Sequence, residues 1–174
     1  MFNYQATYIS QNLWRVTCQN PSAMTGPGTN SYVVKKNGKA VVFDPGPIDC
    51  AHEQALIECA GGLGAIEAIV VTHYHPDHSP LAVVLAKKAG VAIYGGTPVD
   101  DPYQDTSCKP DVVISDGDKL AFQAVTALAV FTPGHVDTHF CFFLPDTGCL
   151  IAGDHIMQGS TVVIIPPHGK MLEY

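Results

Sequence analysis

The stretch "IVVTHYHPDHSP", residues 69–80, decides the fold of this chain and points to its chemistry. A β-branched run ends at Val71, and three histidines and one aspartate follow within positions 73–78. A short apolar run bounded by turn residues is typical of a buried strand. The chain has only eight histidines in total, so their concentration directly after a buried strand requires a chemical explanation.

The spacing of the cluster predicts a metal site. Alternate residues of an extended chain face the same side, so His73 and His75 are expected to project together. Pro76 blocks a continuing helix and turns the chain, which lets Asp77 and His78 point into the same space. Four nitrogen and oxygen donors fixed at a strand end suit a borderline cation such as zinc.

Two later segments add candidate ligands at other strand ends. "FTPGHVDTH", residues 131–139, places His135 after a Pro-Gly pair at the end of an apolar segment. "LIAGDH", residues 150–155, places Asp154 directly after Gly153. A glycine before a ligand lets the backbone approach the site closely. Each motif alone is a common turn, but in this order after the first cluster they strengthen the prediction of a metal site.

Composition and charge limit the function classes. The 174 residues are 47% hydrophobic and 14% charged, as in a single globular domain with its own core. Nine Lys and Arg against sixteen Asp and Glu give a net charge of −7, which argues against generic binding to nucleic-acid backbones. No apolar run is long enough to cross a bilayer.

The six cysteines and the N-terminal residues predict a cytoplasmic protein. None of the cysteines forms a C-x-x-C pair, so free thiols in a reducing compartment are expected. The start "MFNYQATYIS" lacks the basic and apolar regions of a secretory signal.

The remaining chain predicts strands and helices in alternation, followed by a run of strands. Asn37-Gly38 and Asp116-Gly117 each predict a hairpin turn. Ser79 is expected to cap a helix that starts at Pro80 and ends at Gly90. An α/β or α+β domain with a buried central sheet follows. The segments interpreted as strands or hairpins are 31–46, 65–73, 91–96, 111–122, 139–144 and 149–153, and those interpreted as helices are 50–62 and 79–90.

These motifs resemble those of a known superfamily. T-H-Y-H-P-D-H at 72–78, T-P-G-H at 132–135 and G-D at 153–154 are similar to successive metal motifs of the metallo-β-lactamase-fold superfamily. "FDPG" at 43–46 resembles its early aspartate motif. Two other segments, 26–34 and 153–167, look most like the branch of lactamase-β-like proteins, which includes ribonuclease-like members.

The resemblance implies a four-layer αββα sandwich with a binuclear metal site at one edge. Up to two zinc ions are implied, with iron or manganese as alternatives, and in this family a metal-bridging hydroxide attacks the substrate. Asp77, beside its ligand role, is expected to help position the attacking water, and Asp44 to orient the first motif by hydrogen bonding. The ligands implied are His73, His75 and His135 for the first metal, Asp77 and His78 for the second, and Asp154 between them.

The chain departs from the family pattern at its C-terminal end. The family's last ligand is a histidine well beyond the G-D motif, whereas only 20 residues follow Asp154 here. His168 in "IPPHGK" is a candidate substitute but is expected to be a surface-loop histidine. The single domain, residues 1–174, is therefore expected to be incomplete at its C-terminus, and an uncovered sheet face would favour homo-oligomers. Among the other histidines, His139 is expected to be structural, His155 to support the ligands or to be structural, and His52 to be exposed on its helix.

Three classes of function remain open. The leading hypothesis is a metal-dependent hydrolase of esters, thioesters or phosphodiesters, with a small-molecule or RNA substrate and no membrane partner. The second is a metal-binding but weakly active or inactive partial domain that acts through association. The third is redox chemistry on a di-iron version of the site, which normally calls for a flavin partner domain.

Overall fold

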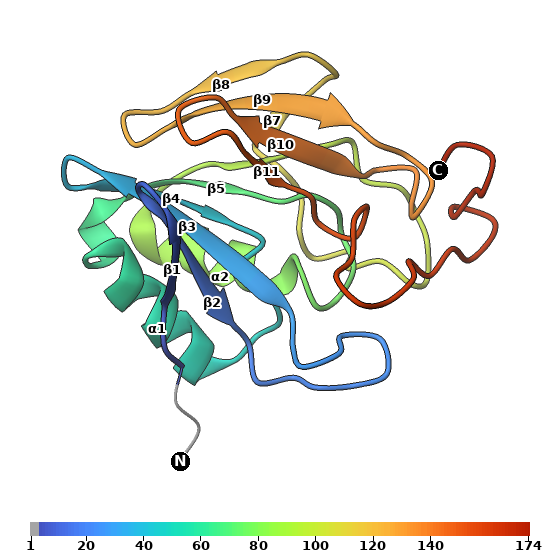
Figure 1. Cartoon of the computed structure of the whole chain (residues 1–174), viewed down its shortest axis with the longest axis horizontal. Coiled ribbons are helices and arrows are strands. Elements are labelled where there is room, and N and C mark those ends of the chain that lie inside the picture. Colours follow the sequence, from blue (N-terminus) through green and yellow to red (C-terminus); the bar gives the residue numbers. More distant parts are fainter. Residues whose placement is uncertain (1–3) are drawn as a thin grey trace.

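Two β-sheets stacked face to face form the centre of the molecule in this computed structural model, which describes residues 4–174 (Figure 1). Within that range the larger sheet has the strand order β1-β2-β3-β4-β5-β6-β7 and the smaller sheet the order β11-β10-β9-β8. The larger sheet consists of β1 (Thr7–Ser10), β2 (Leu13–Thr17), β3 (Asn30–Lys36), β4 (Lys39–Phe43), β5 (Ile66–Val70), β6 (Ile93–Gly95) and β7 (Val112–Val113). The smaller sheet consists of β8 (Lys119–Ala121), β9 (Thr126–Phe131), β10 (Phe140–Leu144) and β11 (Cys149–Ile151).

The predicted hairpin around Asn37-Gly38 is confirmed. It joins β3 to β4 with Lys36 opposite Lys39, and both turn residues have positive φ, 52° and 75°. Asn and Gly tolerate this left-handed conformation, which matches the twist of the flanking strands. From β4 onward the larger sheet is parallel, through β5, β6 and β7.

Two helices lie where the sequence predicts them. Helix α1 (Cys50–Ala60) begins at Asp49, whose side chain accepts hydrogen bonds from two backbone N–H groups, and it ends at Gly61 in the left-handed conformation. Helix α2 (Pro80–Ala89) has proline in its first turn and ends at Gly90. A short 3-10 turn, η1 (Leu63–Ala65), leads into β5.

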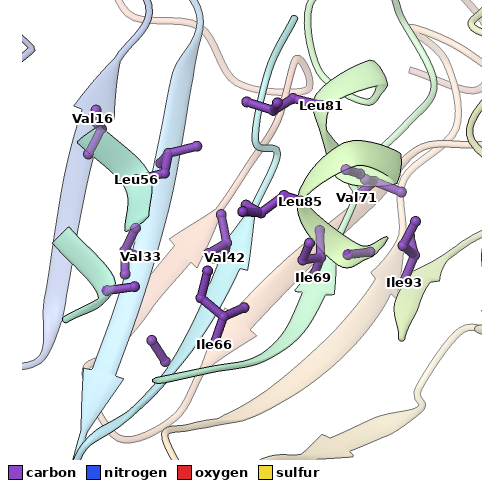
Figure 2. Packing of buried hydrophobic residues seen from close by; sticks show 14 of the residues in the cluster. Val16, Val33, Val42, Leu56, Ile66, Ile69, Val71, Leu81, Leu85 and Ile93 are labelled. Atoms are coloured by element: carbon purple, nitrogen blue, oxygen red, sulfur yellow. The ribbon is translucent and has the colours of Figure 1, made fainter. Parts of the chain in front are cut away.

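Both helices cover the outer face of the larger sheet, and apolar side chains fill the layer between them. Helix α1 packs on β2, β3 and β4, and α2 packs on β5 and β6. Leu56, Leu81 and Leu85 of the helices meet valines and isoleucines of the strands (Figure 2). Truncating a buried leucine such as Leu85 to alanine removes contacts and leaves a cavity, which costs about 2–5 kcal/mol.

A second core lies between the two sheets. Phe43 of β4 and Phe142 of β10 meet there with ring centroids 5.7 Å apart. A backbone hydrogen bond of 2.9 Å from the N–H of Phe140 to the carbonyl of Thr72 joins the start of β10 to the segment just after β5. This bond brings the C-terminal end of β5 to the same edge of the sandwich as the connection between β9 and β10.

The outer face of the smaller sheet is exposed in the described part of the chain. Val130, Phe143 and Leu150 are each about 40% exposed on neighbouring strands of this face. Three layers of the expected four-layer sandwich are therefore present among residues 4–174, in the order helices, larger sheet, smaller sheet (Figure 1). In that range, no helix combines the length and the hydropathy needed to cross a membrane.

Two local predictions are wrong. Residues 111–122 do not form a hairpin, because β7 pairs with β6 in the larger sheet while β8 pairs with β9 in the smaller one. The Asp116-Gly117 turn thus carries the chain from one sheet to the other. The Ser79 side chain does not cap α2 but donates a hydrogen bond of 2.8 Å to Asp105, because that acceptor lies within reach in the folded chain.

Candidate metal centre

All of the predicted ligands lie at one edge of the sandwich, in segments that follow strand ends. His73, His75, Asp77 and His78 follow β5, His135 lies between β9 and β10, and Asp154 follows β11. Because these strands are fixed by the two cores, the segments that follow them start from rigid positions. The structure brings the six residues together, and their roles as ligands stay predictions.

Four of these side chains form a compact donor group. One donor atom from each of His73, His75, His135 and Asp154 lies within 4.8 Å of the others. Nδ1 of His75 is 3.0 Å from Nε2 of His73 and 2.9 Å from Nε2 of His135. Nitrogen ligands of tetrahedral zinc lie about 3.3 Å apart when the Zn–N bonds are about 2.0–2.1 Å. Small side-chain adjustments would therefore let this group hold such an ion.

A second donor group adjoins the first through Asp154. Nε2 of His78 is 3.4 Å from Oδ2 of Asp77 and 3.3 Å from Oδ1 of Asp154. The other oxygen of Asp154, Oδ2, is 3.5 Å from Nε2 of His135. Asp154 thus faces both groups, each through a different carboxylate oxygen.

Asp44 orients two of the histidines from behind. Its carboxylate accepts hydrogen bonds from the Thr72 N–H and hydroxyl, both 2.7 Å, and its Oδ2 lies 3.0 Å from Nδ1 of His78. Since the Thr72 hydroxyl donates to Asp44, it can accept from Nδ1 of His73, 2.9 Å away. With Nδ1 of both rings on the Asp44 and Thr72 side, Nε2 of His73 and Nε2 of His78 face the donor groups.

His135 is oriented by the C-terminal segment. Its Nδ1 lies 2.6 Å from the carbonyl oxygen of Val163, so this nitrogen carries the proton and Nε2 is free to bind a cation. Val163 lies in a segment without regular secondary structure. Nothing in the local sequence around residue 163 indicates this contact.

Thr29 is a further positioning residue that the sequence analysis missed. Its hydroxyl donates a hydrogen bond of 2.8 Å to Oδ2 of Asp77, across 48 positions of the chain. Thr29 begins the approach to β3, and only the pairing of β3, β4 and β5 brings it beside the cluster. Thr72, by contrast, directly precedes the first histidine, so its position in the motif was a usable signal.

Burial and neighbouring charges shift the pKa values of the histidines in the two donor groups in ways that favour cation binding. Burial lowers the pKa of His73 well below its usual value and that of His75 to about 4, and neighbouring histidines add to both effects. Both imidazole rings are therefore neutral at neutral pH, and each has one nitrogen with a lone pair available. Burial also opposes protonation of His78, but Asp154 and other carboxylates raise its pKa well above the usual value. The negative field that favours a proton there favours a divalent cation as well.

The carboxylates are ionised at neutral pH. Burial alone would raise the pKa of Asp154, but the charge of His78 and its hydrogen bond lower it to about 2. Burial likewise opposes ionisation of Asp77, and His78 and Thr29 together hold its pKa well below the usual range. Histidine nitrogens and ionised carboxylates in two adjoining groups match the donor chemistry of zinc and of similar divalent metals.

The other histidines lie outside the four-residue group. Nδ1 of His168 donates a hydrogen bond of 2.9 Å to Oδ2 of Asp137, and His168 is not part of the four-residue group. His139 accepts a hydrogen bond of 3.1 Å from the backbone N–H of Asp154, which fixes the start of that segment. The ring of His155 packs against Tyr174 with centroids 4.9 Å apart. His139 and His155 thus contact the backbone and an aromatic ring, and neither belongs to the four-residue group.

His52 is buried, and its predicted exposure is wrong. Its side chain is 0% exposed and its Nε2 lies 2.8 Å from the hydroxyl of Ser31 on β3. The helical pattern of residues 50–60 did not reveal this, because the polar partner of the imidazole, Ser31, lies on the sheet beneath α1 and not in the helix.

A pocket of about 330 Å³ opens beside the donor groups. Side chains of His75, Asp77, His135 and Asp154 form one wall. The loop between β2 and β3 and the segment after β11 supply much of the remainder, which includes Met24, Met157, Val163 and Ile165. A concave, largely apolar space with a few convergent polar groups is the usual form of a small-molecule site.

Comparisons with known proteins agree with this geometry. The family model described as metallo-beta-lactamase superfamily matches residues 24–173. The lactamase-like protein adaB of Aspergillus niger is 31% identical over 161 residues, which cover 89% of this chain and 48% of that protein. The atrochrysone carboxyl ACP thioesterase nsrC of Aspergillus novofumigatus is 29% identical, with 90% of this chain and 47% of that protein covered. The chain spans about half the length of these curated relatives.

Solved structures share the fold. A metallo-beta-lactamase family protein from Thermus thermophilus has a TM-score of 0.70 at 19% identity, with 87% of this chain and 62% of that chain covered. The B3 metallo-beta-lactamase BLEG-1 has a TM-score of 0.69 at 24% identity, with 86% and 78% covered. At these identities the likeness establishes the arrangement of the sheets and helices.

Proposed function

This chain belongs to the metallo-beta-lactamase superfamily, and we propose that it is a metal-dependent hydrolase of ester, thioester or phosphodiester bonds. One observation carries the proposal: two adjacent donor groups share Asp154, whose two oxygens face His135 and His78 at 3.5 and 3.3 Å. Metal pairs held in this way are a recurrent device for hydrolysis.

Each predicted ligand has a proposed role. His73, His75 and His135 would hold one ion, Asp77 and His78 a second, and Asp154 would contact both. Zinc is the proposed metal, with iron or manganese as alternatives. Divalent ions supply Lewis acidity and lower the pKa of a bound water, so that it becomes a nucleophile near neutral pH.

Asp77 is the proposed catalytic residue of the chain. It lines the pocket, is ionised at neutral pH and is held by the Thr29 hydroxyl at 2.8 Å. A carboxylate in this position can accept a hydrogen bond from the attacking water and direct its lone pair toward the substrate. Asp44 and the backbone carbonyl of Val163 orient the rings of His78 and His135 toward the donor groups.

Two features support an alternative, in which the chain binds metal but is weakly active and acts through association. The second donor group offers only Asp77, His78 and Asp154 among the described residues. The exposed apolar face of the smaller sheet, with Val130, Phe143 and Leu150, is a surface that other protein chains could cover. Homo-oligomers and a cytoplasmic location remain predictions.

The test combines metal content with turnover. The chain would be loaded with zinc and assayed on a thioester, a β-lactam and a phosphodiester, beside Asp77→Asn and Asp154→Asn. We expect metal-dependent turnover of at least one substrate and a loss of at least about 100-fold in both variants. Undiminished turnover in both variants would contradict the hydrolase proposal. Bound metal without turnover on any substrate would favour the alternative.

A further inference from the structure

We infer that the pocket beside the candidate metal centre binds an uncharged, apolar acyl group. The substrate would then be an ester or thioester of an apolar carboxylic acid and not a phosphodiester. The inference rests on the proposed hydrolase function and deepens it, because it selects one substrate class among the three that the donor groups could serve.

The shape and lining of the pocket support an apolar occupant. Its volume of about 330 Å³ is at the lower end of the range for small-molecule sites, about 300–1,000 Å³. Apart from the donor groups, much of the lining consists of apolar side chains from loops of the two halves of the chain. These are Ala23, Met24, Val136, Met157, Val163 and Ile165.

Several of these side chains are exposed to solvent although they are apolar. Met24 is 59% exposed, Ile165 is 50% exposed and Val163 is 39% exposed. Exposed apolar side chains that gather around a concave site mark a surface that a ligand covers. Methionine is also unbranched and polarisable, so Met24 and Met157 can adapt to acyl chains of different shape.

The side chains that line the pocket offer little to hold an anionic substrate. Among the described residues that line it, none is Lys or Arg, while Asp77, Asp101 and Asp154 supply three carboxylates. Bound cations would offset Asp77 and Asp154, but Asp101 lies outside both donor groups. Nucleic-acid backbones and phosphodiesters are held in proteins mainly by Lys and Arg. A phosphodiester would therefore find no Lys or Arg among the described lining residues to hold its phosphate away from the donor groups.

Among the described residues that line the pocket, His168 is the imidazole outside the donor groups, and it already contacts two carboxylates. Nδ1 of His168 is 2.9 Å from Asp137, and its Nε2 is 3.9 Å from Asp101. Lys170 lies two positions after His168, but it does not line the pocket. Its Nζ is 2.9 Å from Oδ1 of Asp137, with which it forms an ion pair. Neither side chain is therefore free to offset the charge of a phosphate in the pocket, which leaves a neutral acyl group as the occupant that the lining favours.

The first test measures turnover against acyl length. The zinc-loaded chain would be given the acetyl, butanoyl, hexanoyl and octanoyl thioesters of N-acetylcysteamine, and bis(4-nitrophenyl) phosphate. Burying one methylene contributes about 0.8 kcal/mol, so we expect kcat/KM to rise about fourfold per added methylene until the pocket is full. Equal kcat/KM across the acyl series, or faster phosphodiester hydrolysis, would overturn the inference while leaving the hydrolase function intact.

The second test measures binding without turnover. S-(2-oxononyl)-N-acetylcysteamine has a methylene between sulfur and carbonyl and cannot be hydrolysed as a thioester. Titration calorimetry on the zinc-loaded chain should show tighter binding than for the short S-(2-oxopropyl) analogue. Equal affinities would overturn the inference. If no substrate is hydrolysed but the long analogue binds more tightly, the hydrolase proposal fails and the acyl pocket stands.

A matched pair of variants locates the effect. Met24→Lys places a cation at the pocket wall, whereas Met171→Lys makes the same change at a methionine that is 70% exposed and does not line the pocket. We expect Met24→Lys to lower the octanoyl-to-acetyl ratio of kcat/KM by at least about fourfold and Met171→Lys to leave it unchanged. The same ratio in both variants would contradict the assignment of the pocket.

Discussion

Oδ2 of Asp44 lies 3.0 Å from Nδ1 of His78, although 34 positions separate the two residues in the chain. The same oxygen accepts a hydrogen bond from the Thr72 hydroxyl, which in turn contacts His73. One buried carboxylate thus sets the orientation of histidines in both donor groups. Asp44 itself has a positive φ of 46°, an uncommon conformation for a residue other than glycine that recurs at functional sites.

Asp44→Asn tests this arrangement. An amide nitrogen cannot accept a hydrogen bond, so either the Thr72 N–H at the Oδ1 position or the Thr72 hydroxyl and His78 at the Oδ2 position lose their acceptor. We expect metal affinity to fall about 10–100-fold, as for other residues that orient ligands, when measured by competition with a chromophoric chelator. Asp146→Asn is the control, because Asp146 is an exposed carboxylate whose ion pair is with Lys36 at 3.6 Å and which belongs to neither donor group. Equal affinities in the two variants would refute the role of Asp44.

Gly153→Ala tests the close approach of the backbone to the site. A Cβ at this position would lie 2.5 Å from Nε2 of His139 and 2.7 Å from Oγ1 of Thr72, and φ is +49°. Gly159 also has positive φ, +76°, but no atom lies within 4 Å of the corresponding Cβ. We expect Gly153→Ala to lower the free energy of unfolding by about 1–3 kcal/mol more than Gly159→Ala, as measured in urea. Equal losses would mean that backbone strain alone explains both variants.

The stability of the chain should depend on pH through His52. Burial lowers the pKa of His52 to about 4, against 6.5 for the free side chain. Its folded form is therefore neutral, and the unfolded chain gains a proton below pH 6.5. The free energy of unfolding then falls as the pH drops from 6.5 to 4, by at most about 3 kcal/mol from this group.

His52→Gln removes this contribution. Urea unfolding with a chelator present, at pH 7 and at pH 4.5, should show a smaller drop for the variant than for the parent chain. The glutamine can keep a hydrogen bond to Ser31, which lies 2.8 Å from the imidazole, so the variant retains a polar partner at this position. An identical drop in both proteins would show that His52 does not titrate as its burial implies.

His168→Ala addresses the last ligand. Because His168 is paired with Asp137 and lies outside the four-residue donor group, we expect the variant to bind as many metal equivalents as the parent. His75→Ala, which removes a ring in contact with both His73 and His135, should lose at least one equivalent. Elemental analysis of protein purified without added metal gives both numbers. A loss of one equivalent in His168→Ala would make His168 a ligand.

Short segments of the sequence specify much of the fold and many of the side chains at the site. The β-branched run before His73, the Asn37-Gly38 turn and the glycines that end α1 and α2 each specify a structure within a few residues. The spacing of His73, His75 and His78 around Pro76 likewise brings their side chains into one cluster of donor groups. These features could be predicted because the favoured backbone conformation and the chemistry lie in the same short segment.

Other features depend on which segments meet after folding. The sequence predicts that residues 112–113 belong to a hairpin with the strand that follows. In the structure they pair in parallel with β6 instead, and the chain crosses from one sheet to the other at Asp116-Gly117. Ser79 has the residue type of a helix cap, yet Asp105 is the acceptor that the folded chain brings to it. In both cases a tertiary partner competes successfully with a local preference of about 1 kcal/mol or less.

The sequence by itself therefore determined the nature of the site, because donor atoms and strand ends are encoded together at residues 73–78, at His135 and at Asp154. Only the tertiary structure decided how those donors are held and what lies beside them. Thr29 reaches Asp77, Val163 reaches His135, and two distant loops form the apolar pocket. The physical reason is that the orientation of the donor side chains and the shape of the pocket arise from contacts between segments far apart in the chain. The residues of one segment do not indicate which other segment they will contact.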